Sequence, residues 1–216
     1  MPNRSVVYID GFNFYYGAVK GTPWKWLDLQ AYWERIRQDD DIRQIYYFTS
    51  QVREPSRLAR QRDYLAALGT LAKVRVVEGR FRRVTLDCPI ACAAVGSRRF
   101  HTHEEKQTDV AIGVQMIDDA YRDVSDRLVV VSGDADLVPA VKMVRPRFPE
   151  KQVLVYVPAN DPMAEGMSQE RGAATELRRA ATRDYTIQPG QFAACQLPET
   201  VRTPRGPISR PAEWSN

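Results

Sequence analysis

Short apolar runs and amphipathic segments alternate along the chain and predict strands and helices that follow one another in turn. Apolar and branched residues form compact runs of strand length, at about 5–10, 42–49, 74–77, 127–132, 152–157 and 185–187. Segments with helical spacing lie between or after them, at 27–38, 55–71, 106–121, 135–145 and 175–182. Strands and helices in this order are typical of a parallel sheet with helices on both faces. We therefore predict an α/β fold with a central, mostly parallel sheet.

The segment from 106 to 121 has the clearest helical pattern. Its residues Val110, Val114, Ile117 and Tyr121 recur at intervals of three and four. This spacing is typical of an amphipathic helix with one apolar stripe. Just before it, residues 87–104 break the alternation and have the character of an insertion, while Arg80 to Leu86 extend the third strand or form a hairpin.

One domain accounts for most of the chain. A length of 216 residues suits a single well-cored α/β domain and is too short for two of ordinary size. We place this domain at residues 1–190, with the insertion at about 87–104. Residues 198–216 contain four prolines, three arginines and few apolar side chains. Because such a segment cannot bury enough apolar surface to order itself, we expect a disordered tail.

The composition favours a protein of the reducing cytoplasm. No apolar run approaches the roughly 20 residues of a membrane span, and no basic region followed by an apolar stretch opens the chain as in a secretory signal. Three cysteines are too few for a disulfide framework. We expect a cytoplasmic protein without membrane contact, and we leave open whether it forms a homo-oligomer.

Carboxylates follow the ends of two predicted strands. The first strand runs into Asp10, and the fourth runs into Asp134 and Asp136. Since the carboxyl ends of parallel strands line one crevice, these side chains should meet there, and Asp109 at the start of the next long helix can be delivered to the same place. Carboxylates this close repel one another, and a hard divalent cation removes that penalty. The sequence therefore predicts a Mg²⁺ or Mn²⁺ site that activates water for attack on a phosphoryl group.

A simpler interpretation gives these acids a structural role. Asp134 and Asp136 would cap the following helix, and Asp10 would end its strand. Each acid alone allows either interpretation. Their joint placement at strand ends favours the metal site.

The order and spacing of three short segments resemble those of a known family. The segments are Asp10-Gly-Phe-Asn13, Glu105-Lys-Gln-Thr-Asp109-Val and Ser132-Gly-Asp134-Ala-Asp136-Leu. They resemble the signature segments of NYN domains, a branch of the PIN-like nuclease superfamily, and the resemblance covers about residues 5–160. It implies a three-layer α/β/α PIN-like fold and a metal-dependent ribonuclease. By that resemblance Asp10, Asp109, Asp134 and Asp136 hold Mg²⁺ or Mn²⁺ around the scissile phosphate.

Three polar residues beside these acids have further expected roles. By the same resemblance, Asn13 orients the cluster or contacts the substrate, and Ser132 supports it by hydrogen bonding. Asn13 has a second interpretation, as the cap of the helix after the first strand. Lys106 is a candidate phosphate contact, and equally a solvent-exposed lysine.

The insertion contains both histidines and two of the three cysteines of the chain. Their spacing is Cys88-x3-Cys92-x8-His101-x-His103, and thiolates with imidazoles are good ligands for tetrahedral Zn²⁺. The spacing matches no standard zinc finger. The alternative is a pair of reduced, packed cysteines with two loop histidines that approach the substrate, so a structural zinc site remains one of two interpretations.

Arginine and aromatic side chains near these motifs favour an anionic partner. The net charge is +4, and arginine, whose planar fork suits phosphate, crowds the helix from Pro55 and the segment after it. Tyr16 and Trp24 are our candidates to stack the bases of single-stranded RNA. A basic surface that only faces solvent and aromatic residues that only fill the core are the alternatives.

These patterns predict a Mg²⁺- or Mn²⁺-dependent endoribonuclease that hydrolyses phosphodiester bonds of single-stranded RNA. The alternative is a non-catalytic module that binds RNA or a nucleotide, and the full set of acids favours catalysis. The segment Gly21-Thr-Pro-Trp-Lys-Trp-Leu-Asp28 also resembles bacterial NYN proteins described as pyridine-ring hydroxylases. Since the sequence has no glycine-rich flavin or nicotinamide loop, a redox role is the weakest of the three expectations.

Overall fold

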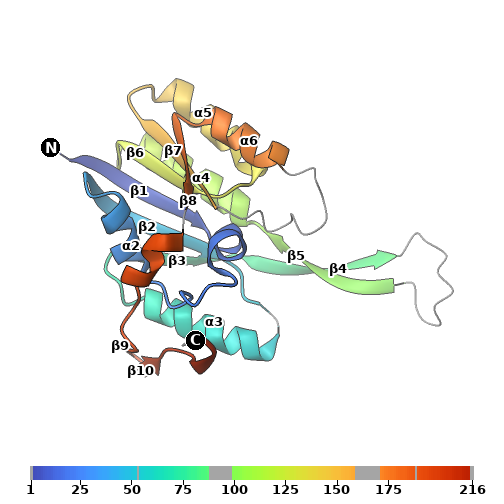
Figure 1. Cartoon of the computed structure of the whole chain (residues 1–216). Coiled ribbons are helices and arrows are strands. Elements are labelled where there is room, and N and C mark those ends of the chain that lie inside the picture. The colour runs from blue at the N-terminus through green and yellow to red at the C-terminus, as the bar shows by residue number, and fades with distance from the viewer. Residues whose placement is uncertain (1, 53, 88–98, 159–170, 188, 215–216) are drawn as a thin grey trace.

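A six-stranded parallel sheet forms the centre of the computed structural model, which describes residues 2–52, 54–87, 99–158, 171–187 and 189–214 (Figure 1). The strand order is β3-β2-β1-β6-β7-β8. The strands are β1 (Asn3–Asp10), β2 (Asp40–Thr49), β3 (Val74–Glu78), β6 (Arg127–Val131), β7 (Gln152–Pro158) and β8 (Arg183–Ile187). The predicted α/β fold and its parallel sheet are therefore confirmed.

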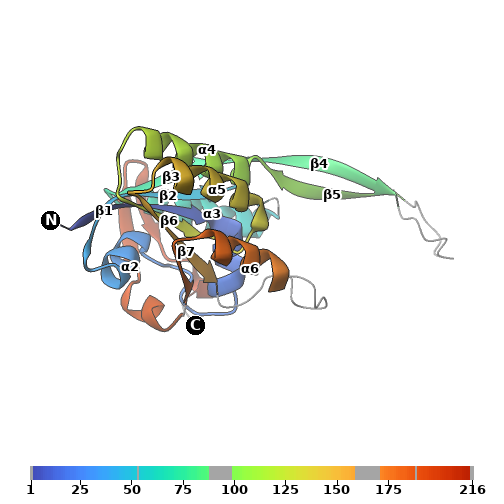
Figure 2. The same ribbon diagram turned by 90° about the horizontal axis from the view of Figure 1, so that it is seen from above.

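Helices cover both faces of this sheet and make three layers (Figure 2). One face carries α1 (Gly11–Phe14), the π-helical turn η1 (Tyr15–Val19), α2 (Leu29–Ile36) and α3 (Pro55–Leu68), and the other carries α4 (Thr108–Tyr121), α5 (Val138–Arg147) and α6 (Arg171–Ala180). Short 3₁₀ turns are η2 (Ala135–Leu137), η3 (Pro189–Ala194) and η4 (Ala212–Trp214). None of the helices in this described part of the chain has the length and apolar character needed to cross a membrane.

Alternation along β1 divides its side chains between two buried cores. Val7 and Ile9 lie in the core beneath α2, whereas Val6 and Tyr8 lie in the core beneath α4. A strand with both faces covered has apolar residues at successive positions instead of at every second one. This is why the strand appears in the sequence as a continuous apolar run.

Most of the apolar stripe predicted for α4 faces away from the core, and only its residue Ile117 packs against it among the four named positions. Val110, Val114 and Tyr121 are 69%, 61% and 61% exposed. The buried positions on this helix are Thr108, Ile112, Gly113, Met116, Asp119 and Ala120. Apolar spacing misidentified the face because small and polar residues lie beside Ile112 and Met116 on the packed face. A Cβ added to Gly113 would lie 3.3 Å from the Cβ of Ala140 on α5.

Two antiparallel strands flank the segment that breaks the alternation, and together they form an arm. The arm consists of β4 (Arg80–Asp87) and β5 (Arg99–Lys106), and it projects from the body of the molecule (Figures 1 and 2). The hairpin alternative for residues 80–86 is therefore correct. Lys106 is the last residue of β5, paired with Arg80, so the predicted helix starts at Thr108 and not at residue 106.

The expected disorder of the C-terminal tail is wrong for residues 198–214. This segment forms a hairpin of β9 (Thr200–Thr203) and β10 (Gly206–Ser209), followed by η4. Trp26 Nε1 donates to the carbonyl of Pro198 at 2.8 Å, and Val201 packs in a buried cluster around Trp26. Composition missed this order because the apolar partners of the tail lie near the other end of the chain.

A buried carboxyl group joins β1 to α4. Asp119 is 2% exposed, and its carboxylate accepts hydrogen bonds from the Tyr8 hydroxyl at 2.9 Å and Gln115 Nε2 at 3.0 Å. Burial raises the pKa of Asp119 from its ordinary value of 3.8, and the two hydrogen bonds oppose that shift. The folded state therefore holds a proton on this group more tightly than the unfolded state does.

Replacing Asp119 by asparagine is expected to remove part of the pH dependence of folding. The raised pKa contributes stability that is present below pH 3.8 and is lost as the pH rises through the folded-state pKa. The D119N variant keeps an acceptor for Tyr8 and lacks this titration, so its free energy of unfolding relative to wild type should increase from acidic to neutral pH. Chemical denaturation across that range measures this difference, and a constant difference at every pH would contradict it.

Candidate active site

The candidate site lies where β1 and β6 end side by side. These strands are parallel neighbours: Ser5 pairs with Arg127 at one end of the ladder, and Ile9 pairs with Val131 at the other. After β1 the chain turns to the face of α2, and after β6 it turns to the face of α5. In open α/β sheets such a reversal leaves a crevice beyond the carboxyl ends of the two strands.

Asp10, at the end of β1, is held by hydrogen bonds on both carboxylate oxygens. The residue is 6% exposed. Its Oδ1 accepts from the backbone amide of Asn13 at 3.0 Å, and its Oδ2 accepts from the hydroxyl of Ser132 at 3.0 Å. The same hydroxyl oxygen accepts from the backbone amide of Asp134 at 3.0 Å. One buried serine therefore connects the acid of β1 with the acidic loop that follows β6.

Asn13 ties the two loops together from the other side. Its Oδ1 accepts from the backbone amide of Gly133 at 3.0 Å. Asp10, and not Asn13, is the N-cap of α1, so the capping interpretation of Asn13 is wrong. The expected role of Asn13 in orienting the acids stays a prediction.

Two of the predicted acids also act as caps. Asp10 caps α1, and Asp134 Oδ1 accepts from the backbone amide of Asp136 at 2.9 Å and so caps η2. A carboxylate has about four acceptor positions on two oxygens, so a capping bond does not use up its capacity to bind a cation. Asp134 is half-buried and Asp136 is exposed.

Asp109 lies where the sequence predicts, in the first turn of α4. This helix packs on the same face of the sheet as Tyr8, and it contacts η2. Among the residues that the structure describes, no three His, Cys, Asp or Glu side chains form a group able to hold a metal ion. The four-acid metal site therefore stays a prediction.

The zinc hypothesis also stays a prediction. His101 and His103 are positions of β5 that pair with Thr85 and Arg83 of β4. Cys88 and Cys92 lie outside the described residues.

The two aromatic candidates for base stacking lie in different places. Tyr16 lines a cavity beside the crevice, and Lys20 Nζ lies 5.0 Å from the centroid of its ring. Trp24 packs against the core beneath α2 and does not line that cavity. Glu213 and Trp214 also line this cavity, although no pattern in the sequence indicates that residues after 198 reach it.

Gly11 is required by a close approach of backbones. A Cβ at this position would lie 2.6 Å from the carbonyl oxygen of Phe48 and 2.8 Å from Cζ of Tyr47. Gly133, at the corresponding place after β6, would meet only ordinary contacts of 3.5 Å or more. The two glycines beside the acids therefore meet different constraints, and only Gly11 is required by a close approach.

A sequence model of the NYN domain matches residues 4–188. The chain belongs to the NYN domain family. It is also similar to 6-hydroxy-3-succinoylpyridine 3-monooxygenase of Pseudomonas putida, with 31% identity over 99% of this chain and 76% of that protein. A solved structure of a protein of unknown function from Vibrio parahaemolyticus is similar in fold, with a TM-score of 0.55 and 20% identity over 87% of this chain and 94% of that one.

Substitution of Gly11 by alanine is expected to destabilise this NYN domain by about 1–3 kcal/mol, the usual cost of overpacking. The obstructing atom is a backbone oxygen, so the clash cannot be relieved by a rotamer change. Gly190→Ala is the matched control, since a Cβ there meets nothing within 4 Å, and surface changes of that kind stay within about 0.5 kcal/mol. Urea denaturation of both variants measures the difference, and equal midpoints would show that Gly11 is not under this constraint.

Proposed function

We propose that the crevice between β1 and β6 hydrolyses phosphodiester bonds of single-stranded RNA with the help of Mg²⁺ or Mn²⁺. The observation that carries the proposal is the hydrogen-bonded connection from Asp10 through Ser132 to Asp134 at the carboxyl edge of the sheet. Membership of the NYN family supports a nuclease-like site. We expect Asp109 and Asp136 to complete the acidic surface of this crevice.

The side chains at this edge fit a magnesium-type ion in their chemistry. Mg²⁺ binds through one or two carboxylates, retained waters and substrate phosphates, and it does not need a cage of protein ligands. Asp10 and Asp134 would hold it, because both supply hard oxygens and both are positioned by backbone amides. When bound, such an ion supplies charge neutralisation at the phosphate and a more acidic water.

The residues of the chain have separate tasks in this proposal. Hydrogen bonds from the backbone amide of Asn13 and the hydroxyl of Ser132 fix the orientation of the Asp10 carboxylate. Asn13 fixes the separation of the two loops through Gly133. Asp134 is half-buried, so part of this residue is accessible to solvent.

Two features support RNA as the proposed substrate: the positive net charge of the chain and the arginines of the β4–β5 arm. The net charge of +4 favours a polyanion, and β4 carries Arg80, Arg82 and Arg83 beside the start of α4. We expect the arm to contact the phosphate backbone outside the crevice. A module that binds RNA without cutting it would use the same surface.

A second candidate function is hydroxylation of a pyridine ring. The observation that favours it is the monooxygenase relative, which is similar over 99% of this chain. Such a reaction consumes O₂ and two electrons from a donor such as a reduced nicotinamide. Incubation with 6-hydroxy-3-succinoylpyridine, O₂ and NADH, followed by chromatography of the products, tests it directly.

Cleavage of labelled single-stranded RNA in the presence of Mn²⁺ is the test of the nuclease. Asp10→Asn and Asp134→Asn are each expected to lower the rate on the order of 10³-fold, because metal stabilisation of a phosphoryl transition state is worth several kcal/mol. Chelation by EDTA should abolish cleavage of wild type.

Glu150→Gln is the matched control. This exposed acid lies in the turn before β7, at the amino-terminal ends of the strands and away from the crevice. Its rate should equal that of wild type. Cleavage that survives both aspartate substitutions would overturn the proposed site. RNA binding without metal and without cleavage would favour the binding module instead.

A further inference from the structure

A second concave site lies on the other side of the end of β1, between α1, β2 and α3. Its volume is about 610 Å³, within the usual range of about 300–1,000 Å³ for small-molecule pockets. Gly11 and Phe12, the two residues after Asp10, form part of its wall. The cavity and the acidic crevice therefore share only this short segment.

Aromatic rings supply much of the cavity wall. Tyr15 and Tyr16 meet edge to face with centroids 5.2 Å apart, and Phe12 lies 6.0 Å from Tyr16. On the opposite side Tyr64 lies 6.4 Å from Tyr47 and 6.0 Å from Trp214. Rings at these angles can make stacked and edge-to-face contacts with a planar ligand. Proteins usually hold aromatic ligands by contacts of this kind.

Cations outnumber acids around these rings. The charged side chains of the wall are Lys20, Lys25, Arg57, Arg60, Glu54 and Glu213, a surplus of two positive charges. Arg60 pairs with Glu213 at 2.9 Å and Arg57 with Glu54 at 3.4 Å. Within the described part of the chain, Lys20 and Lys25 form no ion pair with an acid.

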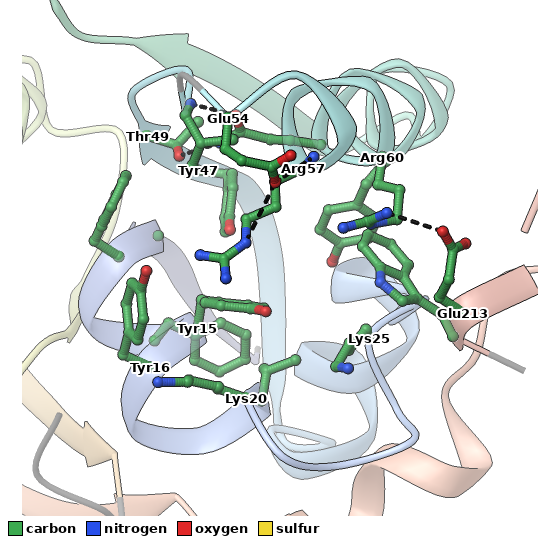
Figure 3. A pocket seen from close by; sticks show the side chains of 18 residues that line it. Tyr15, Tyr16, Lys20, Lys25, Tyr47, Thr49, Glu54, Arg57, Arg60 and Glu213 are labelled. Atoms are coloured by element: carbon green, nitrogen blue, oxygen red, sulfur yellow. Dashed lines mark hydrogen bonds and ion pairs between the residues drawn. The ribbon is translucent and has the colours of Figure 1, made fainter. Parts of the chain in front are cut away.

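Arg57 is placed to exchange its acidic partner for a ligand. Figure 3 shows its side chain extending from α3 into the cavity above Tyr15. The side chains of Arg57 and Glu54 are 67% and 50% exposed, and exposed pairs of this kind contribute little. Burial raises the pKa of Tyr15, and the nearby Arg57 and Arg60 act to lower it.

We propose that this cavity binds a small planar aromatic ring that carries an anionic group. The ring lies among Tyr15, Tyr16 and Tyr47, and the anionic group faces Arg57 and Lys20. A nucleoside monophosphate unit and a pyridine carboxylate share this chemistry. The proposal goes beyond catalysis in the acidic crevice and does not require it.

Titration calorimetry of the full chain with uridine 5′-monophosphate and with nicotinate tests the proposal and identifies the source of the ligand. At least one of the two should bind saturably, and uncharged uridine and inorganic phosphate should each bind more weakly. Arg57→Ala should weaken binding on the order of 10-fold or more, as expected for a lost charge-assisted hydrogen bond. Tyr16→Ala should weaken it on the order of 10-fold by the loss of stacking.

Two further variants make the test specific. Glu213→Gln removes one of the two acids of the wall, so it should tighten binding of the anion and leave uridine unchanged. Arg43→Ala is the matched control, because this exposed arginine pairs with Asp41 in the amino-terminal half of β2, whereas the cavity borders the carboxyl end of that strand. The proposal is wrong if Arg57→Ala and Arg43→Ala bind the anion equally, or if neither probe saturates at millimolar concentration.

Discussion

The parallel pairing of β1 with β2 on one side and with β6 on the other determines where the rest of the molecule can place its chemistry. Because the connections after β1 and β6 pass to opposite faces of the sheet, the end of β1 borders a crevice on its β6 side. The aromatic cavity lies on its β2 side. Asp10 turns toward Ser132 of the β6 loop, and Gly11 and Phe12 turn toward β2. Two sites of different character thus depend on one strand end, and glycine is required there because a Cβ at Gly11 would lie 2.6 Å from the Phe48 carbonyl oxygen.

The structural and chemical interpretations of the acids are compatible. Asp134 caps the turn that follows it, as the simpler interpretation held, whereas Asp136 lies inside that turn. Asp10, which that interpretation placed only at the end of its strand, caps α1. A cap holds a carboxylate in one rotamer before any cation arrives, so it reduces the conformational entropy that binding would otherwise cost. The buried hydroxyl of Ser132 adds to this order, since it is bonded to both acidic loops. Preorganised acids are what a catalytic site needs, and caps are an economical way to make them.

The sequence predicted features that depend on neighbouring residues, and it failed where distant residues decide. The strand that leads to Asp10 and the place of Asp109 in the first turn of a helix follow from local apolar runs and spacing. The packed face of α4 was missed because Gly113 and Asp119 are buried against α5 and Tyr8, which are remote in sequence. The order of residues 198–214 was missed for the same reason, since Trp26 supplies the surface on which the tail folds.

The two sites also differ in how much of the chain builds them. Asp10, Ser132 and Asp134 all lie within the residues that the NYN model matches, which end at 188. The aromatic cavity is closed by Glu213 and Trp214, which lie beyond that match and reach the cavity because the tail is anchored on Trp26. A change in the tail can therefore alter the charge and shape of the cavity while the acids at the strand ends stay in place. In a fold of this kind the acids can keep one chemistry while residues outside the shared domain select the ligand beside them.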